Sequence, residues 1–249
     1  MTGRAPRIVW ISKDDPPDAF PCVDQAFDEP DGLLAAGGDL SADRLLYAYR
    51  HGIFPWYDEG QPILWWSPDP RCVLRPSEFH VARRLRRSLN SSQFEVSFDH
   101  AFNAVIDACA EHRDGQPGTW ITAEMKKAYQ VLHSDGFAHS VEVWHGDALV
   151  GGLYGLGLGR VFFGESMFSR EKNASKAAML VLCKELIARN VELLDCQVVS
   201  PHLMSLGARL IHRSDFAATL ESACEPATRL VLPGDMRRPI KDYLSRSDN

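Results

Sequence analysis

The chain has 249 residues, 45% of them hydrophobic and 24% charged, which is the ordinary balance of a globular protein with a sizeable core. The first 21 residues mix charges with prolines and lack the apolar core of a signal peptide. No apolar run reaches the roughly 18–20 residues that span a membrane. Six dispersed cysteines without a CxxC pair predict no zinc site and fit a reducing compartment, so we expect a cytoplasmic protein that does not enter the membrane.

The charge is unevenly distributed. A formal net charge of −6 argues against a dedicated nucleic-acid-binding domain, which is usually basic. Between Arg71 and Arg87, however, six arginines stand against a single acid, Glu78. This basic island on an acidic protein is a candidate surface for a phosphate backbone.

The N-terminal region, residues 1–38, is rich in Pro, Asp and Gly and predicts loops with one short strand. Ser41 is a favourable N-cap for the first helix, and Gly52 stands where a glycine should end it. We predict a small N-terminal domain over residues 1–61 and a second domain over residues 62–249.

Caps, turn residues and hydrophobic periodicity predict the elements in chain order. Helices are expected at 42–51, 78–89, 101–111, 123–134, 174–188 and 201–206, with a last helix capped by Ser214. Strands are expected at 7–11, 62–67, 94–98, 140–144, 148–156, 161–165 and 192–197, with a hairpin turn at His145-Gly146-Asp147. Helices followed by hairpin strands, then helix, strand and helix, indicate an α+β fold with a mixed, largely antiparallel sheet.

Two segments combine residues that are unusual for a plain core. Residues 52–57 and 65–68 place aromatic rings beside prolines, which suits stacking on a base, although a structural cluster joining two domains is the commoner role. Residues 164–170, Gly-Glu-Ser-Met-Phe-Ser-Arg, lie at the end of a predicted strand that opens into a loop, where functional side chains often lie. A simple ion pair between Glu165 and Arg170 is the alternative.

A third segment, Leu193-Leu194-Asp195-Cys196-Gln197, ends in an acid, a thiol and an amide. Strand alternation places Asp195 and Gln197 on one face and Cys196 on the other, so the first two are expected to address one substrate while Cys196 packs as a small apolar residue. A helix cap or a salt-bridge partner is the alternative role for Asp195. The arginines at 83, 84, 86 and 87 make a positive helix face, or else an ordinary solvated one.

The chain resembles the leucyl/phenylalanyl-tRNA–protein transferases over residues 29–216. The resemblance lies in motifs that follow the family's order: residues 32–40, 49–57, 63–71, 118–122, 164–170 and 173–176, then 195–197 with His202 and 205–208. It implies a small N-terminal domain before an acetyltransferase-like (GNAT-like) domain. It also implies transfer of Leu or Phe from aminoacyl-tRNA to proteins beginning with Arg or Lys, which creates a degradation signal, without a metal or a coenzyme.

The resemblance also implies roles for individual residues. Asp195 would accept a proton from the incoming amine or orient it, Gln197 would hold the ester, and Glu165 would organise the site and attract the cationic side chain. The expected substrate-binding residues are Tyr49, Trp56 and Trp120 around the terminal adenosine, and Leu153, Phe162 and Met167 around the amino-acid side chain. Arg83, Arg84, Arg86 and Arg87 would contact acceptor-stem phosphates.

Three rival functions remain open. An acetyltransferase using acetyl-CoA is disfavoured because the helix start at Asn173-Ala174-Ser175-Lys176 lacks a glycine-rich phosphate turn. A cysteine acyl-enzyme would need Cys196 as nucleophile and His202 as base. A non-catalytic RNA-binding module would leave Glu165, Asp195 and Gln197 without a role. No self-association motif is visible, so a monomer is expected.

Overall fold

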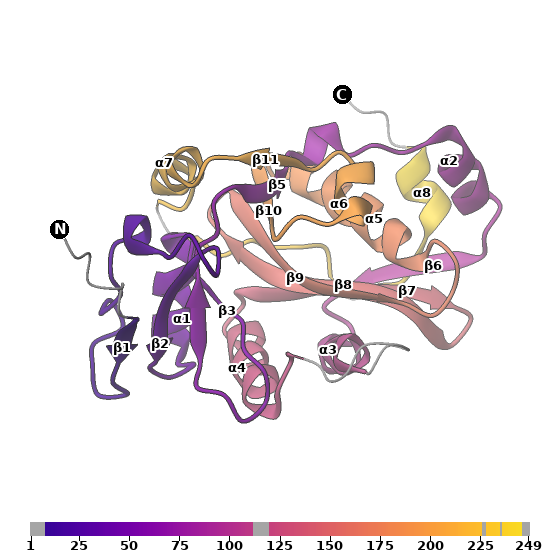
Figure 1. Ribbon diagram of the computed structural model, residues 1–249. Coiled ribbons are helices and arrows are strands. Elements are labelled where there is room, and N and C mark those ends of the chain that lie inside the picture. The colour runs from indigo at the N-terminus through magenta and orange to yellow at the C-terminus, as the bar shows by residue number, and fades with distance from the viewer. Residues whose placement is uncertain (1–7, 112–119, 226–227, 235, 246–249) are drawn as a thin grey trace.

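The computed structural model describes residues 8–111, 120–225, 228–234 and 236–245. Its elements form a small four-stranded sheet and a larger eight-stranded sheet that lie side by side (Figure 1). Among the described residues, no helix combines the length and the apolar character needed to cross a bilayer. The combination of helices with two sheets confirms the α+β prediction.

The small sheet has the strand order β1-β2-β4-β3. Its strands are β1 (Val9–Ile11), β2 (Leu33–Gly37), β3 (Phe54–Pro55) and β4 (Leu64–Trp66), accompanied by the 3-10 turn Val23–Gln25 and by α1 (Ala42–Arg50). Strand β2 was missed in a region predicted as loop, because its burial comes from pairing with β1 and β4 and not from a local pattern. Since β4 pairs with β2 and β3, the small sheet extends past the predicted boundary at residue 61, and the division into domains stays a prediction.

The large sheet has the strand order β11-β5-β10-β9-β8-β7-β6-β12. Its strands are β5 (Arg71–Leu74), β6 (Phe94–Phe98), β7 (Ala138–His145), β8 (Ala148–Leu158), β9 (Val161–Ser169), β10 (Leu193–Gln197), β11 (Arg209–Ile211) and β12 (Arg238–Pro239). Among the pairings between described strands of this sheet, only β9 with β10 is parallel, so the mixed, largely antiparallel sheet is confirmed. The predicted hairpin turn joins β7 to β8, with His145 paired to Ala148.

Helices cover both faces of the large sheet (Figure 1). On one face lie α3 (Phe102–Ala110) and α4 (Ala123–Ser134), and on the other lies α5 (Ala174–Ala188). The remaining helices are α2 (Arg83–Asn90), α6 (Pro201–Ser205), α7 (Arg213–Ala223), α8 (Ile240–Leu244) and the 3-10 turn Pro76–Glu78. Helices α4 and α5 begin and end where the sequence predicts, since each presents a long buried face to the sheet.

Two predicted helix starts are wrong. Helix α2 begins at Arg83 and not at residue 78, because the preceding backbone is extended and the His80 N–H donates to the Leu206 carbonyl. Helix α7 follows His212 and not a Ser214 cap. Asn173 occupies the N-cap position of α5 in a left-handed conformation without a side-chain cap bond, and its side-chain amide donates to the Ser88 hydroxyl.

Candidate active site

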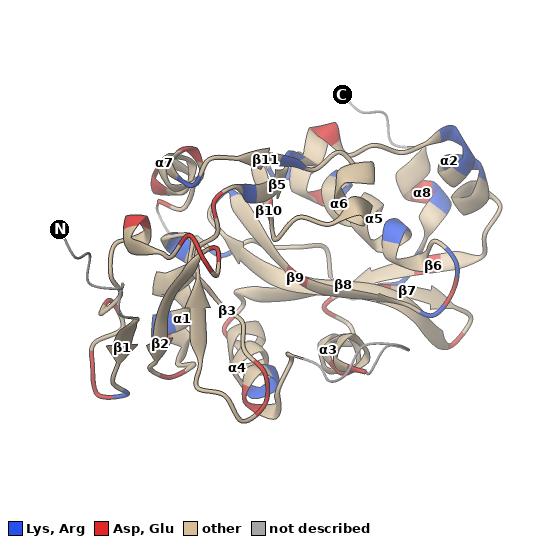
Figure 2. Cartoon of the chain, viewed as in Figure 1, with Lys and Arg blue, Asp and Glu red and all other residues tan. Residues whose placement is uncertain are grey.

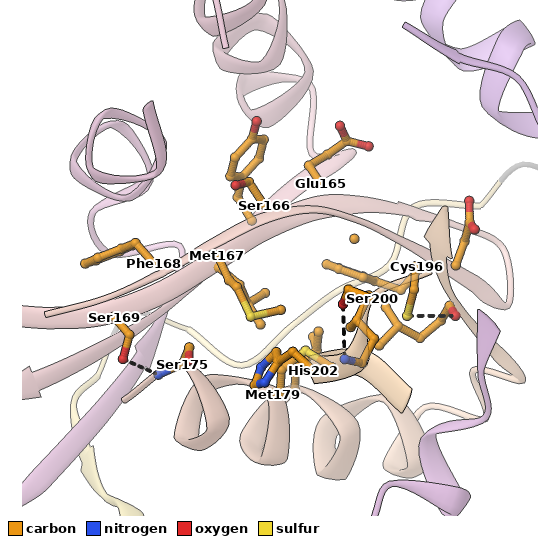
Figure 3. A pocket seen from close by; sticks show the side chains of 18 residues that line it. Glu165, Ser166, Met167, Phe168, Ser169, Ser175, Met179, Cys196, Ser200 and His202 are labelled. Atoms are coloured by element: carbon orange, nitrogen blue, oxygen red, sulfur yellow. Dashed lines mark hydrogen bonds between the residues drawn. The ribbon is translucent and has the colours of Figure 1, made fainter. Parts of the chain in front are cut away.

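The candidate site lies where two neighbouring strands separate. Strands β9 and β10 pair only from Leu193 with Val161 to Asp195 with Phe163. Beyond Phe163, β9 continues beside β8 as far as Ser169, whereas β10 ends at Gln197 and the chain turns into α6. A cavity of about 620 Å³ occupies this separation (Figure 3). Residues 164–170 therefore lie mostly within a strand that has lost one neighbour, and not in the loop that the sequence predicted.

One part of the cavity is apolar and lies on the α5 side of the sheet. Its apolar lining residues come from β8, β9, α5 and β10: Leu153, Phe162, Met167, Met179, Leu182 and Leu194. The three that the sequence predicted, Leu153, Phe162 and Met167, are thus brought together. Met179 and Leu182 were missed because α5 is buried on nearly every side, so its periodicity singles out no functional face.

Glu165 lies on the opposite side of β9 from Met167 (Figure 3), because the pairing of β9 with β8 skips Glu165, a β-bulge that interrupts the alternation of side chains. Its carboxylate accepts three hydrogen bonds: from the Tyr49 hydroxyl at 2.6 Å, the Tyr129 hydroxyl at 2.9 Å and the Gln197 side-chain amide at 2.8 Å. The two tyrosine hydroxyls are also in contact with each other, and because each carries a single proton, the two of them can donate only two of the three hydrogen bonds in this triangle at a time. Tyr129 was missed by sequence reasoning, because it stands on α4 as one of several core-facing residues.

Burial dominates the electrostatics of this group. It raises the pKa of Glu165 to about 7, against the lowering effect of the hydrogen bonds from Tyr49, Tyr129 and Gln197, while the charge of Asp195 raises it further. Burial also raises the pKa of the Tyr49 and Tyr129 hydroxyls well above their usual range, so both remain donors. A carboxyl group that is half ionised near neutral pH can both take up and release a proton.

Asp195 and Gln197 do not share one strand face, although regular alternation would predict that they do. The register of β10 against β5 shifts at Cys196, a β-bulge, and Gln197 has a φ of 60° in the left-handed region. Asp195 is fully buried, and Arg71 donates to both of its carboxylate oxygens, at 2.8 and 2.7 Å. The salt-bridge alternative considered for Asp195 therefore describes its contacts, and its carboxylate also accepts the Gln197 backbone N–H at 2.9 Å.

The predicted adenosine-binding aromatics do not form one wall. Tyr49 is fully buried with its hydroxyl on Glu165, so in this conformation it presents no ring surface to a base. Trp56 is 42% exposed, and its ring centroid lies 5.8 Å from that of Trp66. Trp120 is half-buried against the core cluster that contains Tyr49. Residues 118 and 119 of the predicted motif lie outside the described residues.

The predicted basic surface is present on α2. The side chains of Arg83, Arg84, Arg86 and Arg87 are exposed, while Leu85 and Leu89 anchor the helix to the core. Figure 2 shows α2 as a strongly basic helix at the end of the molecule far from β1. The other segments are more mixed in sign, so the basic island is a feature of the folded surface and not only of the sequence.

The cysteine acyl-enzyme rival finds little support in the geometry. The half-buried thiol of Cys196 points to the Met167 side of the sheet (Figure 3). The adjacent Cys72 thiol and burial raise its pKa well above the usual range, which disfavours a nucleophilic thiolate.

The alternative ion pair of Glu165 with Arg170 is not formed, because Arg170 pairs with Glu111 at 2.5 Å. Within the described parts of the chain, no three His, Cys, Asp or Glu side chains gather as metal ligands would.

Comparison with known proteins assigns the chain to a family. The family model described as leucyl/phenylalanyl-tRNA protein transferase matches residues 73–221, and the model of that family's N-terminal domain matches residues 38–69. Proteins named leucyl/phenylalanyl-tRNA–protein transferase from Pseudomonas aeruginosa (strain UCBPP-PA14) and Chromohalobacter salexigens are 58% and 60% identical. The aligned regions cover 86% and 88% of this chain and 94% and 93% of those proteins.

Among solved structures, a GCN5-related N-acetyltransferase from Kribbella flavida has a TM-score of 0.38 at 10% identity, over 65% of this chain and 58% of that one. The sequence relatives are far closer, and the two family models together match parts of both sheets. Matches of this identity and extent establish the relationship, and the chain belongs to the leucyl/phenylalanyl-tRNA–protein transferase family.

Proposed function

We propose that this protein moves Leu or Phe from aminoacyl-tRNA onto the N-terminal Arg or Lys of acceptor proteins, forming a peptide bond and thereby an N-terminal degradation signal. The observation that carries the proposal is a single cavity that joins an apolar pocket to a buried carboxyl group with a pKa near neutrality. Family membership agrees with it. The reaction is the aminolysis of an ester, which runs downhill to an amide, so it requires neither ATP nor a redox cofactor.

The apolar pocket is suited to the side chain of the transferred amino acid. Met167 and Met179 form part of its wall, and methionine side chains adapt to partners of different shape. An apolar pocket distinguishes one methylene by only about 1–3 kcal/mol. Acceptance of Leu, Phe and Met, with rejection of charged side chains, is the physical expectation.

The polar end of the cavity is suited to the attacking amine. An α-amino group has a pKa of about 7.7–8.0, so part of it is neutral at physiological pH. Once the amine has attacked the ester carbonyl, it must lose a proton. Glu165 is the carboxyl group of the cavity that is not already ion-paired, and it can accept that proton while its negative charge attracts the cationic Arg or Lys residue. The released proton can then reach the departing tRNA hydroxyl.

The tRNA body is assigned to the surface around the cavity. Arg83, Arg84, Arg86 and Arg87 on α2 are exposed cations that can contact acceptor-stem phosphates without reading their sequence. The exposed Trp56 ring offers a stacking surface for a terminal base. Because the donor and acceptor substrates are made in the cytoplasm, we place the protein there, and we propose that it acts as a monomer.

The test is direct transfer. The purified protein is incubated with Leu-tRNA carrying a labelled leucine and with a peptide beginning with Arg, and the product is analysed by mass spectrometry. We expect the peptide to gain one leucine residue. The same peptide with an acetylated N-terminus is the control and should stay unchanged. If the free peptide is not lengthened while the Leu-tRNA remains intact, the proposed function is wrong.

A further inference from the structure

Arg71 was counted in the basic island of the sequence, but it is buried and takes no part in the basic surface of α2. It begins β5, its side chain is 1% exposed, and its guanidinium binds both Asp195 oxygens and the Gly52 carbonyl, the last at 3.0 Å. The group lies between two aromatic rings, 4.8 Å from the centroid of Phe54 and 4.7 Å from that of Phe216. The small sheet, the turn after α1 and helix α7 therefore all hold one cation in place.

Asp195 links the fixed Arg71 guanidinium to the backbone of Gln197. Its Oδ1 accepts both the Arg71 Nε–H and the Gln197 backbone N–H, while Oδ2 accepts a second guanidinium N–H. A carboxylate bound in this way cannot turn toward a substrate without breaking a buried, bidentate ion pair. Its contact with the site runs through the Gln197 backbone.

Gln197 needs such an anchor. Its φ of 60° lies in the left-handed region, which is unfavourable for a residue with a side chain, and the neighbouring bulge removes regular ladder support. In this conformation its amide reaches Glu165 across the point where β9 and β10 no longer pair. Gln197 thus adopts a locally unfavourable backbone conformation that directs its side chain to Glu165. We take this as evidence that the surrounding structure holds Gln197 in position.

We propose that Arg71 is a positioning residue of the transfer site, which holds Asp195 so that Asp195 fixes the left-handed backbone of Gln197 and thereby the orientation of Glu165. The inference rests on the proposed function, because it describes how that site is held in shape. Asp195 then acts on the Gln197 backbone and not on the incoming amine.

The first test is the variant Arg71→Lys, which keeps the buried charge but loses the planar fork that binds two oxygens at once. Single-turnover transfer from pre-bound Leu-tRNA should slow by about 10- to 100-fold, the range expected when a catalytic group is displaced by a fraction of an ångström to an ångström. The KM for the peptide should change less than about threefold, because no substrate contact is lost. The pH at which the rate levels off should rise, because Glu165 loses a hydrogen bond that lowers its pKa.

The matched control is Arg44→Lys. Arg44 is also 1% exposed and ion-paired, with Asp39 at 3.1 Å, but it lies on α1 and does not line the cavity. Both variants should lower the melting temperature, and only Arg71→Lys should change the rate and its pH profile. If both variants change the rate equally, or if Arg71→Lys transfers at the wild-type rate, Arg71 is merely structural.

The second test separates positioning from proton acceptance by Asp195. In the double variant Arg71→Gln/Asp195→Asn neither charge of the buried pair remains, yet the Asn oxygen can still accept the Gln197 N–H. We expect it to transfer at least about tenfold faster than Asp195→Asn alone, whose amide faces an intact guanidinium. If the folded double variant is as slow as the single one, a carboxylate at position 195 is itself required and the inference is overturned.

The two proposals fail differently. If the wild-type protein does not lengthen a peptide that begins with Arg, the proposed function fails. If the wild type is active and Arg71→Lys and the double variant behave against expectation, only the positioning role of Arg71 fails.

Discussion

Replacing Glu165 by Gln removes the proton acceptor but keeps the shape of the buried group. The Gln oxygen can still accept bonds from Tyr49 and Gln197, and its amide can donate to the Tyr129 hydroxyl, which the geometry of the tyrosine pair allows. The variant should therefore fold. If Glu165 accepts the proton of the amine, the rate should fall by roughly 10²–10⁴-fold, the range of general base catalysis.

The pH dependence gives a sharper measure. Transfer needs an ionised Glu165, with a pKa of about 7, and a neutral amine, with a pKa of about 7.7–8.0. Between pH 6 and 7 the ionised fraction of Glu165 rises about fivefold and the neutral fraction of the amine about ninefold. The wild-type rate should therefore rise about 50-fold over this interval, and that of Glu165→Gln only about ninefold.

The assay is single-turnover transfer at subsaturating peptide, where the rate reports the ionisation of the free groups. Glu142→Gln is the matched control, because Glu142 is also fully buried and hydrogen-bonded, to Ser97 and Ser140, but does not line the cavity. Its pH profile should follow the wild type. If Glu165→Gln shows the same 50-fold rise with a rate within about threefold of wild type, the proton goes elsewhere and the reasoning is refuted.

The same pKa predicts an effect on stability. The native pKa of about 7 lies above the unfolded value of about 4.3, so the native state binds the extra proton and becomes less stable as the pH rises between these values. Well above pH 7 the cost reaches about 4 kcal/mol, of which about 3 kcal/mol develops between pH 5 and pH 8. Urea unfolding at pH 5 and pH 8 should show this loss in the wild type, and Glu165→Gln should escape most of it. An equal loss in the variant would mean that other groups cause the pH dependence.

Three further predictions test other parts of the site. Neutralising Arg83 and Arg84 together should weaken the binding of all charged tRNAs alike and flatten its salt dependence, while a minimal aminoacyl-adenosine donor is hardly affected; equal loss with both donors would contradict a phosphate-binding role. Cys196→Ala should keep most of the activity, and a trapped thioester on Cys196 in the wild type would overturn direct transfer. Met179→Ala should enlarge the apolar pocket and lower kcat/KM for Leu more than for Phe, by up to about 10-fold, measured in competition between Leu-tRNA and Phe-tRNA.

Local patterns in the sequence were sufficient for the elements whose signals all lie within one segment. Helices α4 and α5 and the β7–β8 hairpin follow from capping residues, apolar spacing and turn residues that all lie within one segment. Half of the apolar pocket followed as well, from the residue roles that the family resemblance implies. Strand β2 and the start of α2 did not follow, because partners distant in the sequence decide them.

The polar site depended on the tertiary structure. The Arg71–Asp195 ion pair joins residues 124 positions apart, and Tyr129 reaches Glu165 from a helix 36 positions away, so no spacing in the sequence indicates either contact. Alternation along β10 predicted a shared face for Asp195 and Gln197, but the bulge and the left-handed φ at Gln197 give them different partners. Which residues are acids, amides and tyrosines is written in the sequence. Only the folded chain decides that Asp195 is ion-paired and that Glu165 titrates near neutral pH. The reason is that burial excludes solvent, and the exclusion of solvent sets the free-energy cost of each charge.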